Sequence, residues 1–353
     1  MHASFFTRLT ALLLIPGLTL TPVLGFPSAR RPADVLFEGQ ALAPPVEFAR
    51  HFISLGNNRR MTYGLGGNPQ AEKVIVYLHG FGGSRRELAM LEHQDVDARI
   101  IAVDLPGIGG SSRLPEPWLD LWPDDLFHLI TELGVEEFTL VAYSAGGPWA
   151  LACAASKLLG PRVRAVVGAG ALGPATGNYL SFYRLGIKFL YLQTHLFEKY
   201  PMTQRFFFVL GWLWMRSIGS DREWLWRSAF ELMLVTGQSK GEKALLRFHA
   251  GDLHQNWKVA FESGNPAGWL WFMITLSRPW RFRLEAIQCP VDLLHGEWDD
   301  IVPIQLWADI LGENSNLPNF KLVRLSKERH RFIFKTFRIV AEHALALSAG
   351  RAA

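Results

Sequence analysis

The chain has 353 residues, nearly half of them hydrophobic, which is enough to bury a large core as one big domain or two smaller ones. Its net charge is only +4, and no run of five or six Lys or Arg occurs, so nucleic acid is not expected as a partner. The two cysteines, Cys153 and Cys289, each lie in an apolar run. They are predicted to be buried thiols and not a disulfide framework or a metal site.

The N-terminus has the composition of a targeting segment. Arg8 precedes an apolar run of 17 residues, Leu9 to Gly25, that ends in small residues suited to a cleavage site. We expect residues 1–25 to form a signal peptide that directs the protein into the secretory pathway or out of the cell. Two alternatives stay open. One is a membrane anchor, for which the run is short against the usual ~20 residues; the other is a mitochondrial presequence, because arginines precede the first acidic residue, Asp34.

Beyond Asp34 the chain alternates short apolar runs with helix-like stretches. This alternation predicts an α/β fold, with a mostly parallel β-sheet and helices on both faces, built from residues 34–177 and 281–353. The first two runs flank a Gly-Asn-Asn turn signal and are expected to form an antiparallel hairpin. The expected strands cover residues 51–55, 60–65, 73–78, 98–103, 137–143, 163–170, 291–295 and 320–325. Ligands of such sheets bind at the carboxyl ends of the strands, so the loops that follow these runs are candidates for the site.

Residues 178–280 break this alternation and are predicted to form a helical insertion. The segment holds 8 of the 13 tryptophans, and its apolar residues recur at helical spacing. Its most apolar stretch, residues 206–215, is too short to cross a bilayer, which favours a buried helix over a membrane contact.

The segment from Val141 to Gly147 is a strand that breaks into small residues around one serine, Ser144. A strand followed by small-x-Ser-x-Gly, and then by Pro148, fits a nucleophile elbow, a strained strand-to-helix turn that projects the serine Oγ into a site. The flanking residues must be small because helix and strand come closest there. The N–H of Ala145, at the start of the following helix, would then face a developing oxyanion.

A serine hydroxyl alone is a poor nucleophile, so this interpretation requires a base and an acid at later strand ends. His330 follows the last expected strand, and both Asp299 and Asp300 follow the strand before it. A second oxyanion donor is expected from an early loop. The loop His-Gly-Phe-Gly-Gly-Ser supplies one through the N–H of Phe81.

From about Phe52 to the C-terminus the chain resembles the α/β-hydrolase fold superfamily, in its serine-nucleophile branch with a helical cap. The resemblance rests on five segments in order: HGFGGSRREL, DLPGIGGSS, YSAGGPWALACA, GALGP and HGEWDDIVP. It implies roles for five residues: Ser144 as nucleophile, His330 as general base, Asp299 as the acid that orients it, and Phe81 and Ala145 as the oxyanion hole. It also implies that residues 178–280 form a cap above these groups, with aromatic side chains lining an apolar pocket.

Two positions depart from the usual pattern of that superfamily. Ala142 stands at the first elbow position, where the pattern usually has Gly, and so adds a methyl group at a tight contact. His330 lies in the stretch KERHRF instead of the more usual glycine-flanked loop.

Other polar residues near these motifs are expected to have structural roles. His79 is expected to brace the oxyanion loop and Asp104 to organise the loop after its strand, while His295 is expected to be a satisfied core side chain. His249, Asp252 and His254 lie close together, but their spacing differs from the H-E-x-x-H zinc motif. No metal and no cofactor is therefore expected.

Three functional classes follow from these residues. Hydrolysis of a carboxylic ester of an apolar small molecule or lipid is favoured, because a serine, a histidine, an aspartate and two backbone donors form a complete set for a tetrahedral oxyanion. The same set serves peptide, amide or carbon–carbon bond cleavage or lyase chemistry in the second class, and the third is a non-catalytic binding protein on the same fold. The expected partner is an apolar small-molecule substrate. Membrane association through the N-terminal segment or the insertion stays open, as does the oligomeric state.

Overall fold

The computed structural model describes residues 49–91, 93, 95–174, 213, 221–222, 224–226, 230, 240–262, 266–313 and 316–350. The predicted targeting segment and much of the predicted insertion lie outside these residues. Within the described part of the chain, no helix is both long enough and apolar enough to cross a membrane.

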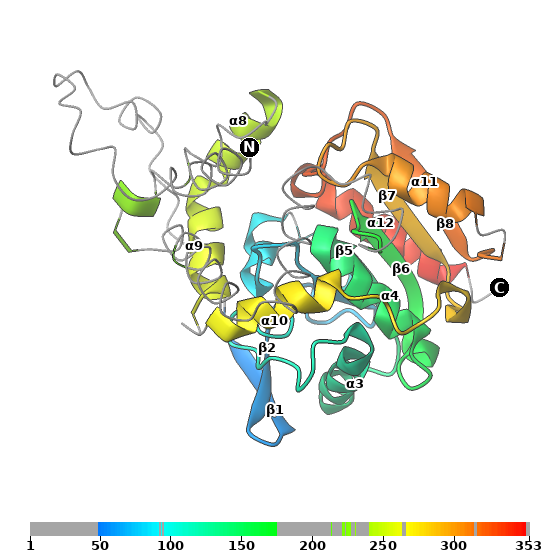
Figure 1. The fold of residues 1–353 in the computed structure, drawn as a ribbon, viewed down its shortest axis with the longest axis horizontal. Helices are drawn as coiled ribbons and strands as arrows, with labels where there is room; N and C mark the ends of the chain where they lie inside the picture. The colour runs from blue at the N-terminus through cyan, green and yellow to red at the C-terminus, as the bar shows by residue number, and fades with distance from the viewer. Residues whose placement is uncertain are drawn as a thin grey trace, which may run out of the picture.

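An eight-stranded sheet organises the described residues (Figure 1). The strands are β1 (His51–Gly56), β2 (Arg59–Gly67), β3 (Val74–Leu78), β4 (Arg99–Val103), β5 (Phe138–Tyr143), β6 (Val163–Ala169), β7 (Val291–Gly296) and β8 (Phe320–Leu325). Their order across the sheet is β1-β2-β4-β3-β5-β6-β7-β8. The pairs β1–β2 and β2–β4 are antiparallel and the other pairs are parallel. The predicted mostly parallel α/β sheet is confirmed, and each of its strands coincides with an apolar run of the sequence.

The opening hairpin forms as predicted, through its Asn-Asn turn. Asn57 and Asn58, between β1 and β2, both have positive φ, +49° and +58°. Two consecutive left-handed residues define the type I′ turn that matches the twist of antiparallel strands, and asparagine tolerates this conformation better than most residues do.

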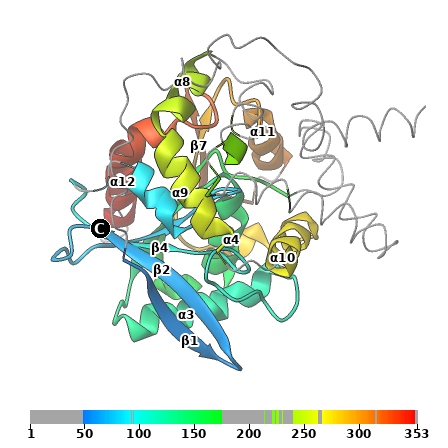
Figure 2. The same cartoon turned by 90° about the vertical axis from the view of Figure 1, so that its left-hand side faces the viewer.

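Helices cover both faces of the sheet (Figure 2). They are η1 (Arg85–Met90), η2 (Leu119–Leu121), α3 (Trp122–Glu132), η3 (Ser144–Gly146), α4 (Gly147–Ala155), η4 (Gly160–Arg162), α8 (Lys240–Phe248), α9 (Ala250–Ala260), α10 (Pro266–Ser277), η6 (Leu284–Ala286), α11 (Ile304–Glu313) and α12 (Ile333–Ala349). Successive residues of β3 point to opposite faces. Val74, Val76 and Leu78 pack with α3, α4 and α11, whereas Ile75 and Tyr77 pack with η1 and α12.

The two loops that carry the serine and the oxyanion motif meet because of the strand order. The chain runs from β3 outward to β4 and then crosses back to β5, which pairs with the other edge of β3. In open α/β sheets, ligands bind at such a switch point, outside the carboxyl ends of the strands. The loop 79–84 after β3 and the turn at Ser144 after β5 therefore lie side by side.

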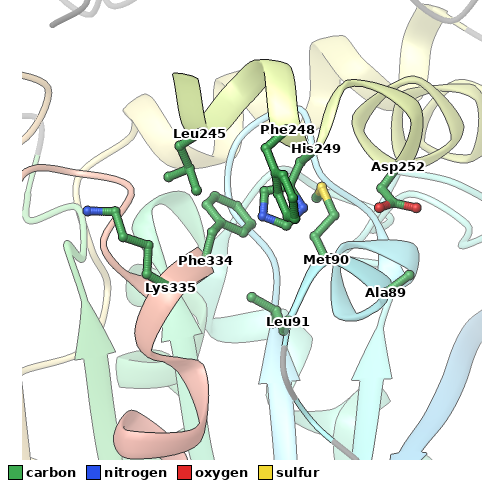
Figure 3. A pocket seen from close by; sticks show the side chains of 9 residues that line it. All are labelled: Ala89, Met90, Leu91, Leu245, Phe248, His249, Asp252, Phe334 and Lys335. Carbon is green, nitrogen blue, oxygen red and sulfur yellow. The ribbon is translucent and has the colours of Figure 1, made fainter. Parts of the chain in front are cut away.

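Three helices of the predicted insertion, α8, α9 and α10, are described. The strand arrows of the sheet point toward α8 and α9 (Figure 3), so these helices lie beyond the carboxyl ends of the strands. Helix α10 packs into the main core, where its Phe272 stacks on Trp149 of α4 with ring centroids 5.9 Å apart. Most of residues 178–239 lie outside the described part, so the cap and its boundaries stay a prediction. Cys153 and Cys289 are both buried, as predicted.

Candidate active site

Ser144 sits on a tight turn between β5 and the helix that follows. Its φ is +49°, a left-handed value that costs a non-glycine residue about 1–2 kcal/mol. Gly146 makes the turn fit, because a Cβ there would lie 2.6 Å from the carbonyl oxygen of Leu78. The N–H of Leu172, in the loop after β6, donates a 2.9 Å hydrogen bond to the carbonyl of Ser144. The turn is therefore held from both neighbouring strands.

The methyl group of Ala142, the first departure from the family pattern, has room in the sheet. Ala142 is fully buried on β5 and lies opposite Leu78 of β3 on one side and Gly168 of β6 on the other. Paired residues of neighbouring strands project to the same face, and Gly168 adds no side chain there; a Cβ on Gly168 would lie 2.9 Å from side-chain atoms of Ala171 and Leu293.

His330 connects Ser144 to Asp299. Its Nε2 lies 2.9 Å from the Oγ of Ser144, and its Nδ1 lies 2.8 Å from Oδ2 of Asp299. The other carboxylate oxygen of Asp299 accepts the N–H groups of Ile301 and Val302, both at 2.9 Å. All three side chains of the chain Ser144–His330–Asp299 are buried. The structure thus brings together the three side chains that the sequence singled out.

The electrostatics of these three hydrogen-bonded side chains favour the ionised form of Asp299. Burial raises the pKa of Asp299, but the charge and hydrogen bond of His330 and the N–H of Val302 outweigh burial, so the pKa lies below its ordinary value. An ionised Asp299 accepts a hydrogen bond from Nδ1–H of His330. Nε2 of His330 then carries a lone pair that can accept the proton of Ser144.

Asp300, the alternative acid, turns elsewhere. Its carboxylate lies 3.7 Å from the guanidinium of Arg329, and Asp299 alone of the two reaches His330. The loop with His330 is locked to the loop with Asp299, because the N–H of Trp298 donates to the carbonyl of Glu328 at 2.9 Å.

The second departure from the family pattern is accommodated by a left-handed lysine. Lys327 has φ +60°, a conformation that glycine adopts at less cost. It lies in the turn that leads from β8 to His330, so the KERHRF loop makes without a glycine the turn that brings His330 to Ser144.

Gly170, directly after β6, is a site residue that the sequence analysis did not single out. Its φ is +55°, and a Cβ there would lie 3.1 Å from Nδ1 of His330 and 3.4 Å from Oδ2 of Asp299. A glycine is needed here for two reasons, its backbone conformation and its contact with the His330–Asp299 pair. The Gly-Ala-Gly run at the end of the strand was the only signal of this role in the sequence.

The predicted oxyanion loop lies against the serine turn. A Cβ on Gly80 would lie 3.5 Å from Cβ of Ser144, so the N–H of the next residue, Phe81, is carried close to the serine. Ala145 is buried at the start of the helical turn after Ser144, where the first N–H groups of a helix have no intrahelical acceptor. The two predicted donors therefore come from neighbouring loops.

Two buried side chains hold the carbonyl and the N–H of Gly80. His79 accepts the N–H of Leu105 at Nε2, 3.1 Å away, so its Nδ1–H is free to donate to the carbonyl of Gly80 at 2.8 Å. Burial lowers the pKa of His79, which keeps the ring neutral. The carboxyl of Glu87 accepts the N–H of Gly80 at 3.0 Å and the hydroxyl of Tyr77 at 2.9 Å. The bracing role predicted for His79 is confirmed.

Glu87 differs from the other buried carboxyls near the site, and the sequence analysis did not notice it. Burial raises the pKa of Glu87 to about 7, against the opposing effect of its hydrogen bonds from Gly80 and Tyr77. The carboxyl therefore carries a proton for part of the time near neutral pH, directly behind the oxyanion loop.

Asp104 organises the loop after β4, as predicted. Its carboxylate accepts the hydroxyl of Thr62 at 2.6 Å, the backbone N–H of Arg85 at 2.6 Å and the N–H of Gly110 at 3.2 Å, and it pairs with the Arg85 guanidinium. His295 is fully buried, as expected, and burial lowers its pKa to about 4. Its ring nitrogens make no hydrogen bond of ordinary geometry with the described residues, and a weaker hydrogen bond with the backbone of Val302 partly opposes the effect of burial on its pKa.

A cavity of about 470 Å³ opens beside the site, between α8, α9, η1 and α12 (Figure 3). Six of the nine residues that line it are apolar: Ala89, Met90, Leu91, Leu245, Phe248 and Phe334. Polar atoms nevertheless form more of its exposed surface than apolar atoms do, and the other three lining residues are His249, Asp252 and Lys335. Phe334 connects the cavity to the serine turn. Its ring meets Tyr143 edge-on with centroids 5.3 Å apart, and Tyr143 in turn lies 5.3 Å from the ring of His330.

The histidines near this cavity do not form a metal site with Asp252. His254 stacks on Trp226 with ring centroids 4.5 Å apart, and His249 lies near Phe334. Across the described ranges, no group of three or more His, Cys, Asp or Glu side chains has the geometry to hold a metal ion.

Residues 75–336 match the sequence profile of the Alpha/beta hydrolase family. The chain belongs to this family. The matched range contains every side chain of the site, from the oxyanion loop after β3 to His330 before α12. The protein is accordingly an enzyme of the alpha/beta hydrolase family.

Individual proteins resemble this alpha/beta hydrolase either over a short segment or at low sequence identity. A 2-succinyl-6-hydroxy-2,4-cyclohexadiene-1-carboxylate synthase of Escherichia coli O8 is 36% identical over 86 residues, which cover 24% of this chain and 34% of that protein. The match thus spans about a third of the length of the curated relatives. A structure reported among carboxylesterases of Nitrososphaera gargenis and an esterase of Exiguobacterium antarcticum each have a TM-score of 0.56 at 17% identity, covering 85% of this chain and 100% of theirs. At such identities the likeness shows the fold.

The position of Gly170 makes a testable prediction for this hydrolase. Gly170→Ala should lower the rate at which a fluorophosphonate modifies Ser144 by about tenfold or more, because the new methyl group displaces His330. The matched control is Gly134→Ala, whose φ of +64° is equally left-handed but whose added Cβ meets nothing within 4 Å.

Both variants should lose about 1–2 kcal/mol of unfolding free energy, measured by denaturant titration, because both place a side chain on left-handed backbone. Only Gly170→Ala should slow the labelling. Equal labelling rates in the two variants would contradict the role of Gly170.

Proposed function

We propose that this protein is a serine hydrolase that cleaves a carboxylic ester of an apolar small molecule or lipid. One observation carries the proposal: the hydrogen-bonded chain from Ser144 Oγ through His330 to Asp299, with Ser144 on a left-handed turn. The esterase folds of the structural neighbours are consistent with it.

In the proposed mechanism, Oγ of Ser144 attacks the ester carbonyl while Nε2 of His330 takes its proton. Asp299 holds the imidazole in the tautomer that leaves Nε2 free and stabilises the imidazolium that forms. The N–H groups of Phe81 and Ala145 donate to the oxyanion of the tetrahedral intermediate. His330 then returns the proton to the leaving alcohol, and water repeats the sequence to release the acid.

A second candidate is non-hydrolytic use of the same three side chains. The observation that favours it is the 36% identity over 86 residues with a curated synthase. Turnover of a panel of esters, thioesters and amides separates the two candidates, because only the hydrolase releases an acid from simple esters.

Ser144 should be the residue that reacts. A fluorophosphonate probe should label wild-type protein at Ser144, and Ser144→Ala should remain folded while its kcat on esters falls by something approaching the ~10⁶ reported for triad serines. The labelled peptide is identified by mass spectrometry. Ester hydrolysis by Ser144→Ala within a few fold of wild type would remove the basis of the mechanism.

Substitution of the two neighbouring aspartates should have very different effects on kcat. Asp299→Asn should lower kcat by about 10⁴, because an amide favours the wrong tautomer of His330. Asp300→Asn is the matched control and should lose less than about threefold, because the Asp300 carboxylate pairs with Arg329 at 3.7 Å, a contact worth little at a partly exposed site. Kinetics at one pH decide the point, and the reverse ranking would reassign the acid.

The enzyme should have its highest kcat/KM on esters whose acyl chain is of medium length. Phe81 meets Trp269 edge-on with ring centroids 5.1 Å apart, and six of the nine residues that line the cavity at Phe334 are apolar. Each buried methylene contributes ~0.8 kcal/mol, so kcat/KM on p-nitrophenyl esters should rise severalfold per two-carbon step from acetate and fall once the pocket is full.

A variant that fills the cavity tests where the acyl chain goes. Leu245→Trp should shift the optimum to shorter esters, because Leu245 lines the cavity. Leu158→Trp is the control, because Leu158 is exposed in the connection before β6, at the amino ends of the parallel strands and not at their carboxyl ends. A profile that is highest at acetate and declines steadily would refute an apolar acyl pocket and leave the mechanism untouched.

A further inference from the structure

The oxyanion loop is bonded to helix α9 through a buried asparagine. Oδ1 of Asn256 accepts both the backbone N–H of Ser84, at 3.0 Å, and its hydroxyl, at 2.6 Å. Both residues are buried: 0% of the surface of Ser84 and 1% of that of Asn256 is exposed. The two residues are 172 positions apart in the chain. The Ser84 oxygen also accepts the N–H of Arg86 at 3.2 Å and so caps η1.

Neighbouring side chains of the insertion contact the same loop. The ring of Phe81 packs edge-on against Trp269 of α10, and a Cβ on Gly82 would lie 3.5 Å from the indole nitrogen of Trp257. These apolar contacts limit how far the loop can tilt. Among the contacts that the described residues of the insertion make with this loop, the Asn256 bond to the Ser84 N–H is the one that fixes the loop backbone directionally, because hydrogen bonds weaken steeply when they are bent.

Asn256 is an unusual choice for its own helix. Asparagine is a weak helix former, and position 256 lies inside α9, which runs from Ala250 to Ala260. A buried amide there costs free energy unless it is bonded. The contact with Ser84 offsets both costs, so the local sequence of α9 is adapted to the loop as well as to the helix.

We propose that Asn256 is a positioning residue for ester hydrolysis, and that it sets the place of the Phe81 N–H by holding Ser84. The inference rests on the proposed function, since it concerns the oxyanion hole of that reaction. Gly80 is fixed at one end of the loop by Glu87 and His79, and Ser84 is fixed at the other end by Asn256. Phe81 lies between these two anchors.

Loss of the Asn256 side chain should therefore affect the transition state more than substrate binding. With Asn256→Ala, the buried N–H of Ser84 loses its acceptor and the hydroxyl of Ser84 keeps only its 3.2 Å hydrogen bond to the backbone carbonyl of residue 256, so the loop relaxes away from the oxyanion position. We expect kcat on p-nitrophenyl butyrate to fall about 10- to 100-fold, as for a misplaced oxyanion donor, while KM changes less than about threefold. The inhibition constant of a matching trifluoromethyl ketone, whose adduct places an oxyanion in the hole, should rise by the same factor as kcat falls.

Two further variants separate positioning from a general effect on the helix. Asn256→Asp keeps an acceptor oxygen for both Ser84 donors, and its kcat should exceed that of Asn256→Ala by about fivefold or more. Gln255→Ala removes an amide from the preceding position of α9 without touching the pair, and it should behave as wild type. Melting temperatures of all variants are recorded, because a merely structural role would lower them without changing the ketone affinity of the folded protein.

Several outcomes would overturn the inference. A kcat for Asn256→Ala within twofold of wild type would do so, as would a loss of kcat with unchanged ketone affinity, or an Asn256→Asp variant no better than Asn256→Ala. If Asn256→Ala does not fold, Ser84→Ala removes the hydroxyl half of the pair, and its kcat should fall about 3- to 10-fold at constant KM; an unchanged kcat would again contradict the inference.

Failure of the proposed function is recognised separately. It would appear as wild-type protein that neither hydrolyses esters nor reacts with the fluorophosphonate. An active, labelled wild type with a fully active Asn256→Ala variant would overturn the role of Asn256 alone.

Discussion

The left-handed backbone at Ser144 is the constraint on which the rest of the site depends. A serine held at φ +49° is strained, so the surrounding structure must determine it. The carbonyl oxygen of Leu78 lies so close to position 146 that only glycine fits there. The N–H of Leu172 donates a hydrogen bond to the carbonyl of Ser144. The pairing of β5 between β3 and β6 supplies both contacts, and it also brings the oxyanion loop to the serine.

Three buried carboxyls near the site show how surroundings determine the role of a residue. Asp299 faces an imidazole and two N–H groups, and its pKa lies below the ordinary value. Asp104 pairs with the Arg85 guanidinium and serves as an anchor for loops. Glu87 is bonded by neutral donors, an N–H and a hydroxyl, and its pKa rises to about 7. The same chemical group is thus the partner of an imidazole at Asp299, an anchor for loops at Asp104 and a neutral or charged brace at Glu87.

The strands of the sheet and the position of Ser144 could be predicted from sequence because they depend on local patterns. The strands appear as apolar runs, and Ser144 is marked by the small residues that its turn requires. The choice of Asp299 over Asp300 rested on a resemblance, whereas the structure shows its physical reason, the loop contact from Trp298 to Glu328 that aligns Asp299 with His330.

The remainder could not be predicted because it depends on contacts between distant segments. Gly170 is one of 32 glycines, and its role appears only when His330 is placed beside it. Asn256 lies in a helix without any motif, and its partner Ser84 is 172 positions away. The raised pKa of Glu87 follows from its burial beneath the oxyanion loop, which the charged stretch SRREL does not reveal.

The loop 79–84, which carries the proposed oxyanion donor Phe81, is one place where the sheet and helix α9 meet. Glu87 and His79 hold Gly80 from the sheet side, and Asn256 of α9 holds Ser84. A displacement of α9 relative to the sheet would therefore be transmitted to the donor between these anchors. An acyl chain that fills the cavity beneath α8 and α9 contacts the same pair of helices, so its binding energy can reach the reacting carbonyl through the backbone. By this route, a longer ester would gain in kcat as well as in affinity, because contacts far from the scissile bond stabilise the loop in the position that the transition state requires.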